Sequence, residues 1–379
     1  MLHVTKKPSF TIYKPLYKLS QFFSVFPNNS KCYSYITVLF YLLILIMKVN
    51  LQPGVRDSVQ MLDLFINILA SFCTLLSVAT LNFVKKDKIR DLFVILTTID
   101  LELRHTYKCE RKLSYKGRLT FFVSQAVIIL LTLMAARNSY VYLDFKFTLQ
   151  YIPVYIYLYV VVLVILQYNF LVAVIGIRCK LLNDKLSELG ATMSVYKKSK
   201  TSVRSILVQN INPKFFTKNY ERINDATILV NNIFGLQILF IFALILLFVV
   251  RALNIVFASF VQYLESNRIR RTPVVIGNLS GSFIFLAFGF TVSSTCTQTV
   301  RKMKQASFMG WELLLCLPLD VTYGKKNLEK DLIYFETIVT NRFTPFSAAG
   351  LFDVDLKVVF SILSSVSTIL ILVMQLFPS

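Results

Sequence analysis

The 379-residue sequence has few of the residues that build metal, nucleotide or redox sites. It contains only 2 His and 6 Cys, with no Cys-x-x-Cys, no His-x-x-x-His and no glycine-rich phosphate-binding motif. Charged residues are also scarce at 16%, where a soluble protein carries about 25%. We therefore expect no cofactor, no metal ion and no enzymatic activity, and the charge deficit argues against a soluble protein.

Apolar residues make up 55% of the chain and are gathered in long runs. A membrane-spanning helix needs about 20 mostly apolar residues. Seven runs of about this length occur, at approximately 33–49, 60–83, 119–136, 148–177, 232–261, 274–297 and 355–377. The alternating ten-residue segments of a membrane β-barrel are not seen. The sequence predicts an all-α membrane protein with seven transmembrane helices.

The distribution of Lys and Arg predicts the orientation of these helices. With the N-terminus in the cytoplasm, the inner segments 1–32, 84–118, 178–231 and 298–354 hold 5, 10, 10 and 7 basic residues. The outer loops hold only 1, 2 and 3. The net charge of +21 is then the usual signature of an inner membrane face, and no nucleic-acid partner is expected. This orientation places the C-terminus outside the cell.

The last predicted helix carries a stripe of polar side chains along one face. At about 100° per residue, its members fall within about 100° of one another. They are Lys357, Ser361, Ser364, Ser365, Thr368 and Gln375. Such a stripe either joins helices by hydrogen bonds or faces water inside a pore, and the residues alone leave both interpretations open.

Other polar groups lie in the predicted outer half of the membrane. Asp63 and Arg251 are charges inside spans, so they either pair with each other or face a ligand pocket. Tyr155 and Tyr159 share one helix face and suit either an interfacial aromatic belt or contact with a ligand. The remaining outer-half candidates are Asn67, Asn254, Asn278 and Ser282.

Two further patterns concern packing. Gly277-x-x-x-Gly281 in the sixth span predicts a close approach of another helix. Leu328–Phe343 has apolar residues at helical spacing, which predicts an amphipathic helix that lies on the membrane or packs inside the protein.

A motif at the end of the chain resembles one in a known family. The last span contains Thr368-Ile369, five apolar residues and then Gln375-Leu376. Insect gustatory receptors typically end in Thr-Tyr, five apolar residues and Gln-Phe in this helix. The segment 346–355 resembles the stretch leading into that helix, and the inverted seven-span topology matches as well. Ile369 and Leu376 depart from the Tyr and Phe of the family pattern.

The resemblance implies a gustatory receptor that acts as a ligand-gated, non-selective cation channel in the plasma membrane of chemosensory neurons. It implies a homo- or heterotetramer that contacts membrane lipids and binds a small-molecule tastant. The sparse polar groups of the outer half lean toward bitter or other plant compounds over sugars. A seven-span metabotropic receptor and a secondary transporter are the alternatives.

The predicted spans divide the chain, and the resemblance implies the roles of its last two parts. A cytoplasmic tail covers 1–32, and a six-helix ligand-sensing region covers 33–297 with cytoplasmic loops 84–118 and 178–231. A cytoplasmic anchor covers 298–354, and the pore-lining helix covers 355–379. The implied pore and gate residues are Ser361, Ser364, Ser365, Thr368, Leu372, Gln375 and Leu376. The candidate ligand-binding residues are Asp63, Asn67, Tyr155, Tyr159, Arg251, Asn254, Asn278 and Ser282.

Overall fold

The computed structural model describes residues 35–43, 46, 58–107, 145–197, 213–266, 272–316 and 323–376. The predicted third span, 119–136, and part of the first, 33–49, lie outside these residues. The side chains of Leu372 and Leu376 also lie outside what is described.

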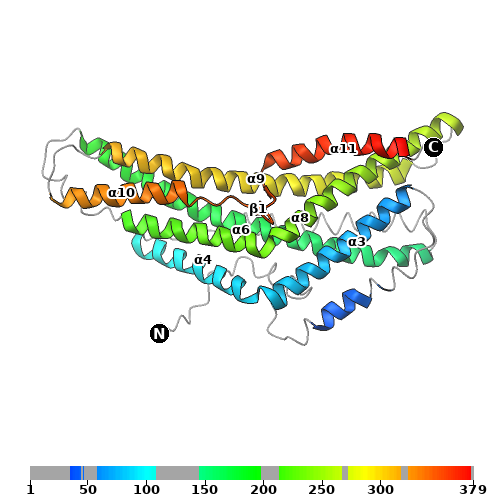
Figure 1. Ribbon diagram of the computed structural model, residues 1–379, viewed down its shortest axis with the longest axis horizontal. Helices are drawn as coiled ribbons and strands as arrows, with labels where there is room; N and C mark the ends of the chain where they lie inside the picture. Colours follow the sequence, from blue (N-terminus) through cyan, green and yellow to red (C-terminus); the bar gives the residue numbers. More distant parts are fainter. Residues whose placement is uncertain are drawn as a thin grey trace.

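The described chain is almost entirely helical (Figure 1). Residues 35–43 are helical. The labelled helices are α3 (Ser58–Ala79), the π-helix η2 (Thr80–Val84), α4 (Lys86–Tyr107), α6 (Phe145–Lys197), α8 (Pro213–Ser266), α9 (Thr272–Cys316), α10 (Tyr323–Asn341) and α11 (Leu356–Leu376). Strands β1 (Ser347–Ala348) and β2 (Phe352–Asp353) form a small antiparallel hairpin between α10 and α11.

Four helices of the described ranges are long and apolar enough to cross a membrane. The candidate spans are Leu62–Val84, Tyr155–Thr192, Pro213–Phe257 and Val275–Leu315, and α11 adds the shorter apolar stretch Leu356–Ile369. These five segments overlap the second, fourth, fifth, sixth and seventh predicted spans. The multi-pass helical membrane fold predicted from the sequence is therefore confirmed.

The helices continue far beyond the bilayer. α6 and α8 contain 53 and 54 residues, which at 1.5 Å per residue is about 80 Å. The hydrocarbon core is only about 30 Å thick. Much of the basic segments 84–118, 178–231 and 298–354 is helical. Of these helices, the sequence analysis predicted only the amphipathic stretch Leu328–Phe343.

The bend between α3 and α4 is a π-helix turn (Figure 1). The Lys85 N–H reaches back five residues to the Thr80 carbonyl at 2.8 Å, so an extra residue is accommodated in the helix. The Asn82 side chain donates to the Val78 carbonyl at 2.9 Å, which keeps this backbone oxygen satisfied near the bend.

Helix α6 is buried on most sides by its neighbours. It contacts α3, α4, α8 and α9, and the six residues Val160–Ile165 are all buried. α6 approaches α9 closely at Gly176, where an added Cβ would lie 2.5 Å from Oγ1 of Thr299. At Gly281 an added Cβ would meet nothing within 4 Å, so the predicted close packing there is wrong within the protomer.

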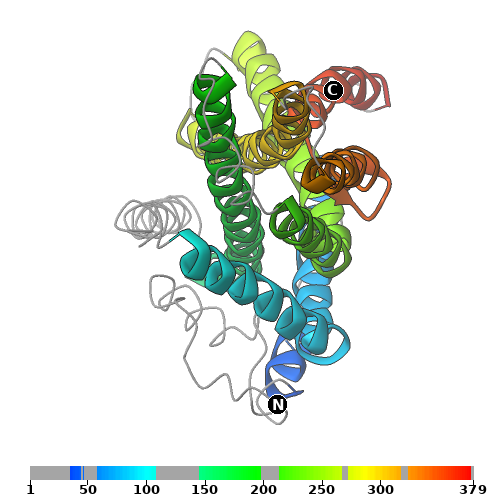
Figure 2. The same cartoon turned by 90° about the vertical axis from the view of Figure 1, so that its left-hand side faces the viewer.

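Helices α10 and α11 lie toward opposite ends of the long axis, and the hairpin joins them near its middle (Figure 1). Viewed along that axis, α4 and α11 lie on opposite sides of the bundle (Figure 2). Leu332, Phe335 and Ile338 of α10 are buried, and α10 contacts α8 and α9. The predicted amphipathic helix is confirmed, and its apolar face packs inside the protein.

Candidate pore stripe and ligand site

The polar stripe of α11 points away from the rest of the protomer. Every member is exposed: Lys357, Ser361, Ser364, Ser365, Thr368 and Gln375. Val359 and Val366 are buried at 6% and 3% exposure, and at about 100° per residue they lie nearly opposite the centre of the stripe. Val366 packs in a cluster with Val249 and Val250 of α8. One face of α11 therefore holds it to the protomer, and the polar face is presented outward.

Hydroxyl groups on a membrane helix need hydrogen-bond partners, which lipid tails cannot supply. Ser365 partly meets this need by donating to the Ser361 carbonyl at 2.9 Å. The remaining capacity of the stripe has to be met by water or by another protein surface. The exposed stripe thus suits a wet pore or a contact between subunits, and it does not suit a face covered by lipid.

Three helices meet at the guanidinium of Arg251. Arg251 on α8 donates two hydrogen bonds to the carboxylate of Asp63 on α3, one of them at 3.2 Å. It also donates to the side-chain oxygen of Asn278 on α9. The Arg251 and Asp63 side chains are 22% and 25% exposed, so the pair is only partly shielded. Of the two alternatives for these charges, the structure shows that they pair.

The other candidate ligand residues have different surroundings. Ser282 lies one turn from Asn278 and donates to the Phe248 carbonyl at 2.8 Å, which ties α9 to α8. Asn254 is buried at 6% exposure. Asn67, Tyr155 and Tyr159 are each partly buried. The structure therefore brings Asp63, Arg251 and Asn278 together, and Ser282 serves helix packing beside them.

Tyr157 is the deeply buried tyrosine of this part of α6, at 1% exposure. Its hydroxyl donates to the Tyr41 carbonyl at 2.7 Å, and the two rings lie 5.9 Å apart. The sequence analysis selected Tyr155 and Tyr159 instead. Spacing identified which tyrosines share a face but not which face the neighbouring helices would cover.

A second polar cluster ties α4 to α8 in the predicted cytoplasmic half, and sequence reasoning missed it. The Glu102 carboxylate forms an ion pair with Arg222 at 2.7 Å and accepts hydrogen bonds from Lys218 and Asn219, each at 3.2 Å. Burial raises the pKa of Glu102, but its contacts with the positively charged Arg222 and Lys218 outweigh this effect and hold the pKa below its ordinary value. Its stabilising effect is present above the unfolded-state pKa and is lost as pH falls through the folded-state pKa.

The chain was compared with known proteins. Residues 13–376 match the model of the family described as 7tm Chemosensory receptor. A comparison with curated protein sequences finds no match. Among solved structures, the chain is similar to the insect olfactory receptor OR5 from Machilis hrabei, with 12% identity and a TM-score of 0.57. That match covers 99% of this chain and 93% of the OR5 chain, and it shows a common fold. The chain belongs to the 7tm chemosensory receptor family, whose members are membrane receptors rather than enzymes.

Proposed function

We propose that the protein is a gustatory receptor that works as a ligand-gated, non-selective cation channel, with a pore lined by α11. The observation that carries this proposal is the exposed polar stripe opposite the packed face of α11. Copies of α11 around a common axis would turn their stripes toward a water-filled path, which supplies the hydrogen bonds that lipid cannot. Membership of a chemosensory receptor family supports a receptor for small molecules.

The proposed assembly is a homo- or heterotetramer in the plasma membrane of chemosensory neurons, with the N-terminus inside. In the segment 298–354, which we propose lies outside the membrane, large apolar side chains are exposed at the C-terminal end of α9 and on α10. Phe308, Trp311 and Leu315 are 63%, 53% and 71% exposed, and Tyr334 is 54% exposed. Exposed apolar groups in water favour burial against another protein surface. They support the anchor role proposed for residues 298–354.

The proposed gate is at the outer end of α11. Gln375 is exposed there, and Leu376 follows it. Leu372 falls on the same face as the polar stripe, where a ring of leucines would close the pore by excluding water. Lys357 at the inner end is exposed, and its long side chain can extend to the inner interface instead of obstructing cations.

The ligand proposed for the outer half of the bundle is a small plant compound of bitter type. The Asp63–Arg251–Asn278 cluster lies there and joins α3, α8 and α9, so a ligand that altered this cluster would act on three helices at once. Asn67, Tyr155, Tyr159, Asn254 and Ser282 complete the proposed set of ligand-binding residues.

The test is current recording from cells that express the full chain. Fructose, sucrose, caffeine and denatonium are applied in turn. We expect caffeine or denatonium to evoke an inward cation current that is absent from untransfected cells. A chain that reaches the surface but conducts no ions, and instead takes up a tested compound, would be a transporter and would contradict the proposal. If no subunit partner is supplied, the same recording shows whether the chain functions alone.

A further inference from the structure

Residues 231–235 of α8 hold the segment that leads into the pore helix. Nδ2 of Asn231 donates to the Pro345 carbonyl at 2.7 Å, and its Oδ1 accepts from the Ser347 N–H at 3.1 Å. Two turns earlier, Oδ1 of Asn224 accepts from the Thr344 N–H at 3.0 Å. Side-chain amides of α8 therefore satisfy the backbone of residues 344–347, which form no helix of their own.

The hairpin fits closely against α8. A Cβ added at Gly235 would lie 2.9 Å from the backbone nitrogen of Ala349 and 3.2 Å from its Cα. These atoms belong to the turn, where Ala349 and Gly350 have φ values of 53° and 76°. Only glycine at position 235 lets the turn approach this near without a shift of backbone.

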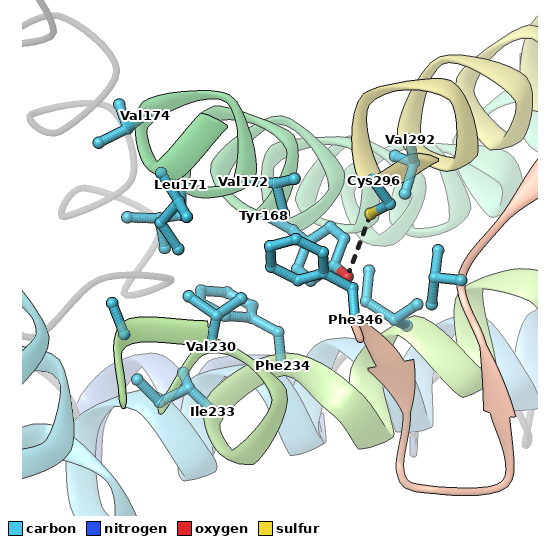
Figure 3. Packing of buried hydrophobic residues seen from close by; sticks show 14 of the residues in the cluster. Tyr168, Leu171, Val172, Val174, Val230, Ile233, Phe234, Val292, Cys296 and Phe346 are labelled. Carbon is cyan, nitrogen blue, oxygen red and sulfur yellow. Dashed lines mark hydrogen bonds between the residues drawn. The ribbon is translucent and has the colours of Figure 1, made fainter. Parts of the chain in front are cut away.

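Phe346 anchors the same segment in the core. It is 1% exposed, and its ring lies 6.4 Å from that of Tyr168 on α6. Figure 3 shows Phe346 pointing between Tyr168 and the side chain of Phe234 on α8. The Phe346 carbonyl accepts from the Val354 N–H at 2.7 Å, which closes the hairpin.

The fixed hairpin leads directly into α11. Asp355, the first residue after Val354, caps the helix because its Oδ1 accepts from the N–H groups of Lys357 at 2.9 Å and Val358 at 3.3 Å. No flexible linker separates the docked hairpin from the first turn of α11. A displacement of the hairpin must therefore move the start of the pore helix.

The same turn of α8 also contacts the bend between α3 and α4. Nζ of Lys85 donates to the carbonyl of Asn232, the residue after Asn231. α3 ends at this bend, and its other end carries Asp63 of the Arg251 cluster. The contact at Asn232 and the contact at Asn231 thus connect the candidate ligand region and the pore helix to one short stretch of α8.

We infer that Asn231 is a positioning residue for gating, which transmits movement of α3 and α8 to α11 through the hairpin 344–355. The inference rests on the proposed channel function. Removing its two hydrogen bonds leaves a backbone donor and acceptor unpaired, which shifts the balance between docked and undocked hairpin by about tenfold. Lys85 contributes from the other side of the same α8 turn.

The first arm of the test needs neither ligand nor current. Hydrogen–deuterium exchange is measured on the purified full-length protein in lipid nanodiscs. We expect Asn231→Ala to speed exchange of the amides in residues 344–358 about tenfold. Asn232→Ala is the matched control, because Asn232 is the neighbouring residue of the same type and is exposed. Equal exchange in the two variants would overturn the inference.

The second arm measures gating at equal surface expression, with caffeine and denatonium as probes. Asn231→Ala is expected to lower the ratio of probe-evoked to probe-free current about fivefold or more, and Asn232→Ala to leave it unchanged. Lys85→Met should lower the same ratio, and the double variant should fall short of the product of the two effects. An unchanged ratio in Asn231→Ala would overturn the coupling role, because a purely structural residue would alter only the number of surface receptors.

The two arms separate failure of the inference from failure of the proposed function. A wild-type chain that conducts no current at normal surface expression contradicts the channel, and with it the gating role. The exchange result still decides whether Asn231 positions α11. If the wild type conducts current and the Asn231→Ala and Asn232→Ala variants behave alike, the channel function is supported and the inference about Asn231 is contradicted.

Discussion

At the scale of single residues, Arg251 shows how a charge is kept within a membrane helix. An intramembrane Arg is costly unless it is paired or faces water. Asp63 provides the opposite charge and Asn278 an additional acceptor, so the guanidinium is bonded to α3 and α9 at once. The Asp63–Arg251–Asn278 cluster therefore fixes the relative positions of three helices in the region where we propose that ligand binds.

Asp63→Asn is expected to destabilise the protein by about 2 kcal/mol, because it leaves the Arg251 charge without a countercharge in a partly shielded site. The loss of stability is measured as a fall in the midpoint of thermal unfolding, which is detected by size-exclusion chromatography of a fluorescent fusion. The double variant Asp63→Leu with Arg251→Met should be less destabilised than the sum of its single variants. Lys357→Met, which removes an exposed charge from α11, is the control. Strictly additive effects would contradict the pairing.

The pairing of Asp63 with Arg251 was accessible to sequence reasoning because very few charges fall within the apolar spans. The hydrogen bond from Arg251 to Asn278 was not accessible in this way, because the sequence indicated only how deep Asn278 lies in the membrane. Likewise, spacing placed Tyr155 and Tyr159 on one face, but the deeply buried residue is Tyr157. Which side of a helix is covered depends on neighbours that are distant in sequence.

At the scale of elements, α6 and α9 are held together by a close approach at Gly176. Thr299 packs on this glycine and donates to the Val172 carbonyl at 3.4 Å. The sequence pattern pointed instead to Gly277 and Gly281. A small-xxx-small pattern indicates that a helix could be approached closely, but it does not identify which surface another helix covers.

Gly176→Ala is expected to destabilise the protein by about 1–3 kcal/mol, because the new methyl group would overlap the Thr299 side chain. Gly281→Ala provides the matched control, since a Cβ there meets nothing within 4 Å in the protomer. Thermal unfolding midpoints compare the two variants. Adding Thr299→Ala to Gly176→Ala should restore part of the loss. A Gly281→Ala variant that is destabilised as much as Gly176→Ala would instead indicate close packing at Gly281 between protomers.

The lengths of the helices were the part of the fold least visible in the sequence. Hydropathy detects only the roughly 30 Å that lie in lipid. Outside that layer, helices such as α4 alternate apolar and charged residues, and their stability comes from packing and from ion pairs such as Glu102 with Arg222. The apolar spans and the amphipathic α10 were predicted because their patterns are periodic and local.

At the scale of the whole molecule, the excess of basic residues predicts a cytoplasmic N-terminus and an extracellular C-terminus. Antibody staining of cells that express a chain tagged at each end tests this orientation. We expect the C-terminal tag to be stained on intact cells and the N-terminal tag only after permeabilisation. Asn28-Asn29-Ser30 matches a glycosylation sequon, and we expect it to carry no glycan because it would be cytoplasmic. The opposite staining would contradict the orientation and favour a metabotropic receptor.

The central claim is that the polar stripe of α11 lines a cation pore, and cysteine substitution tests it most directly. Current through Ser364→Cys receptors is recorded before and after external application of a positively charged, thiol-specific reagent. Ser367→Cys is the matched control, because Ser367 is exposed but lies outside the stripe, and the wild type controls for native cysteines. The account predicts that the reagent blocks the Ser364→Cys current and spares both controls. A Ser364→Cys current that persists while Ser367→Cys is blocked would contradict it.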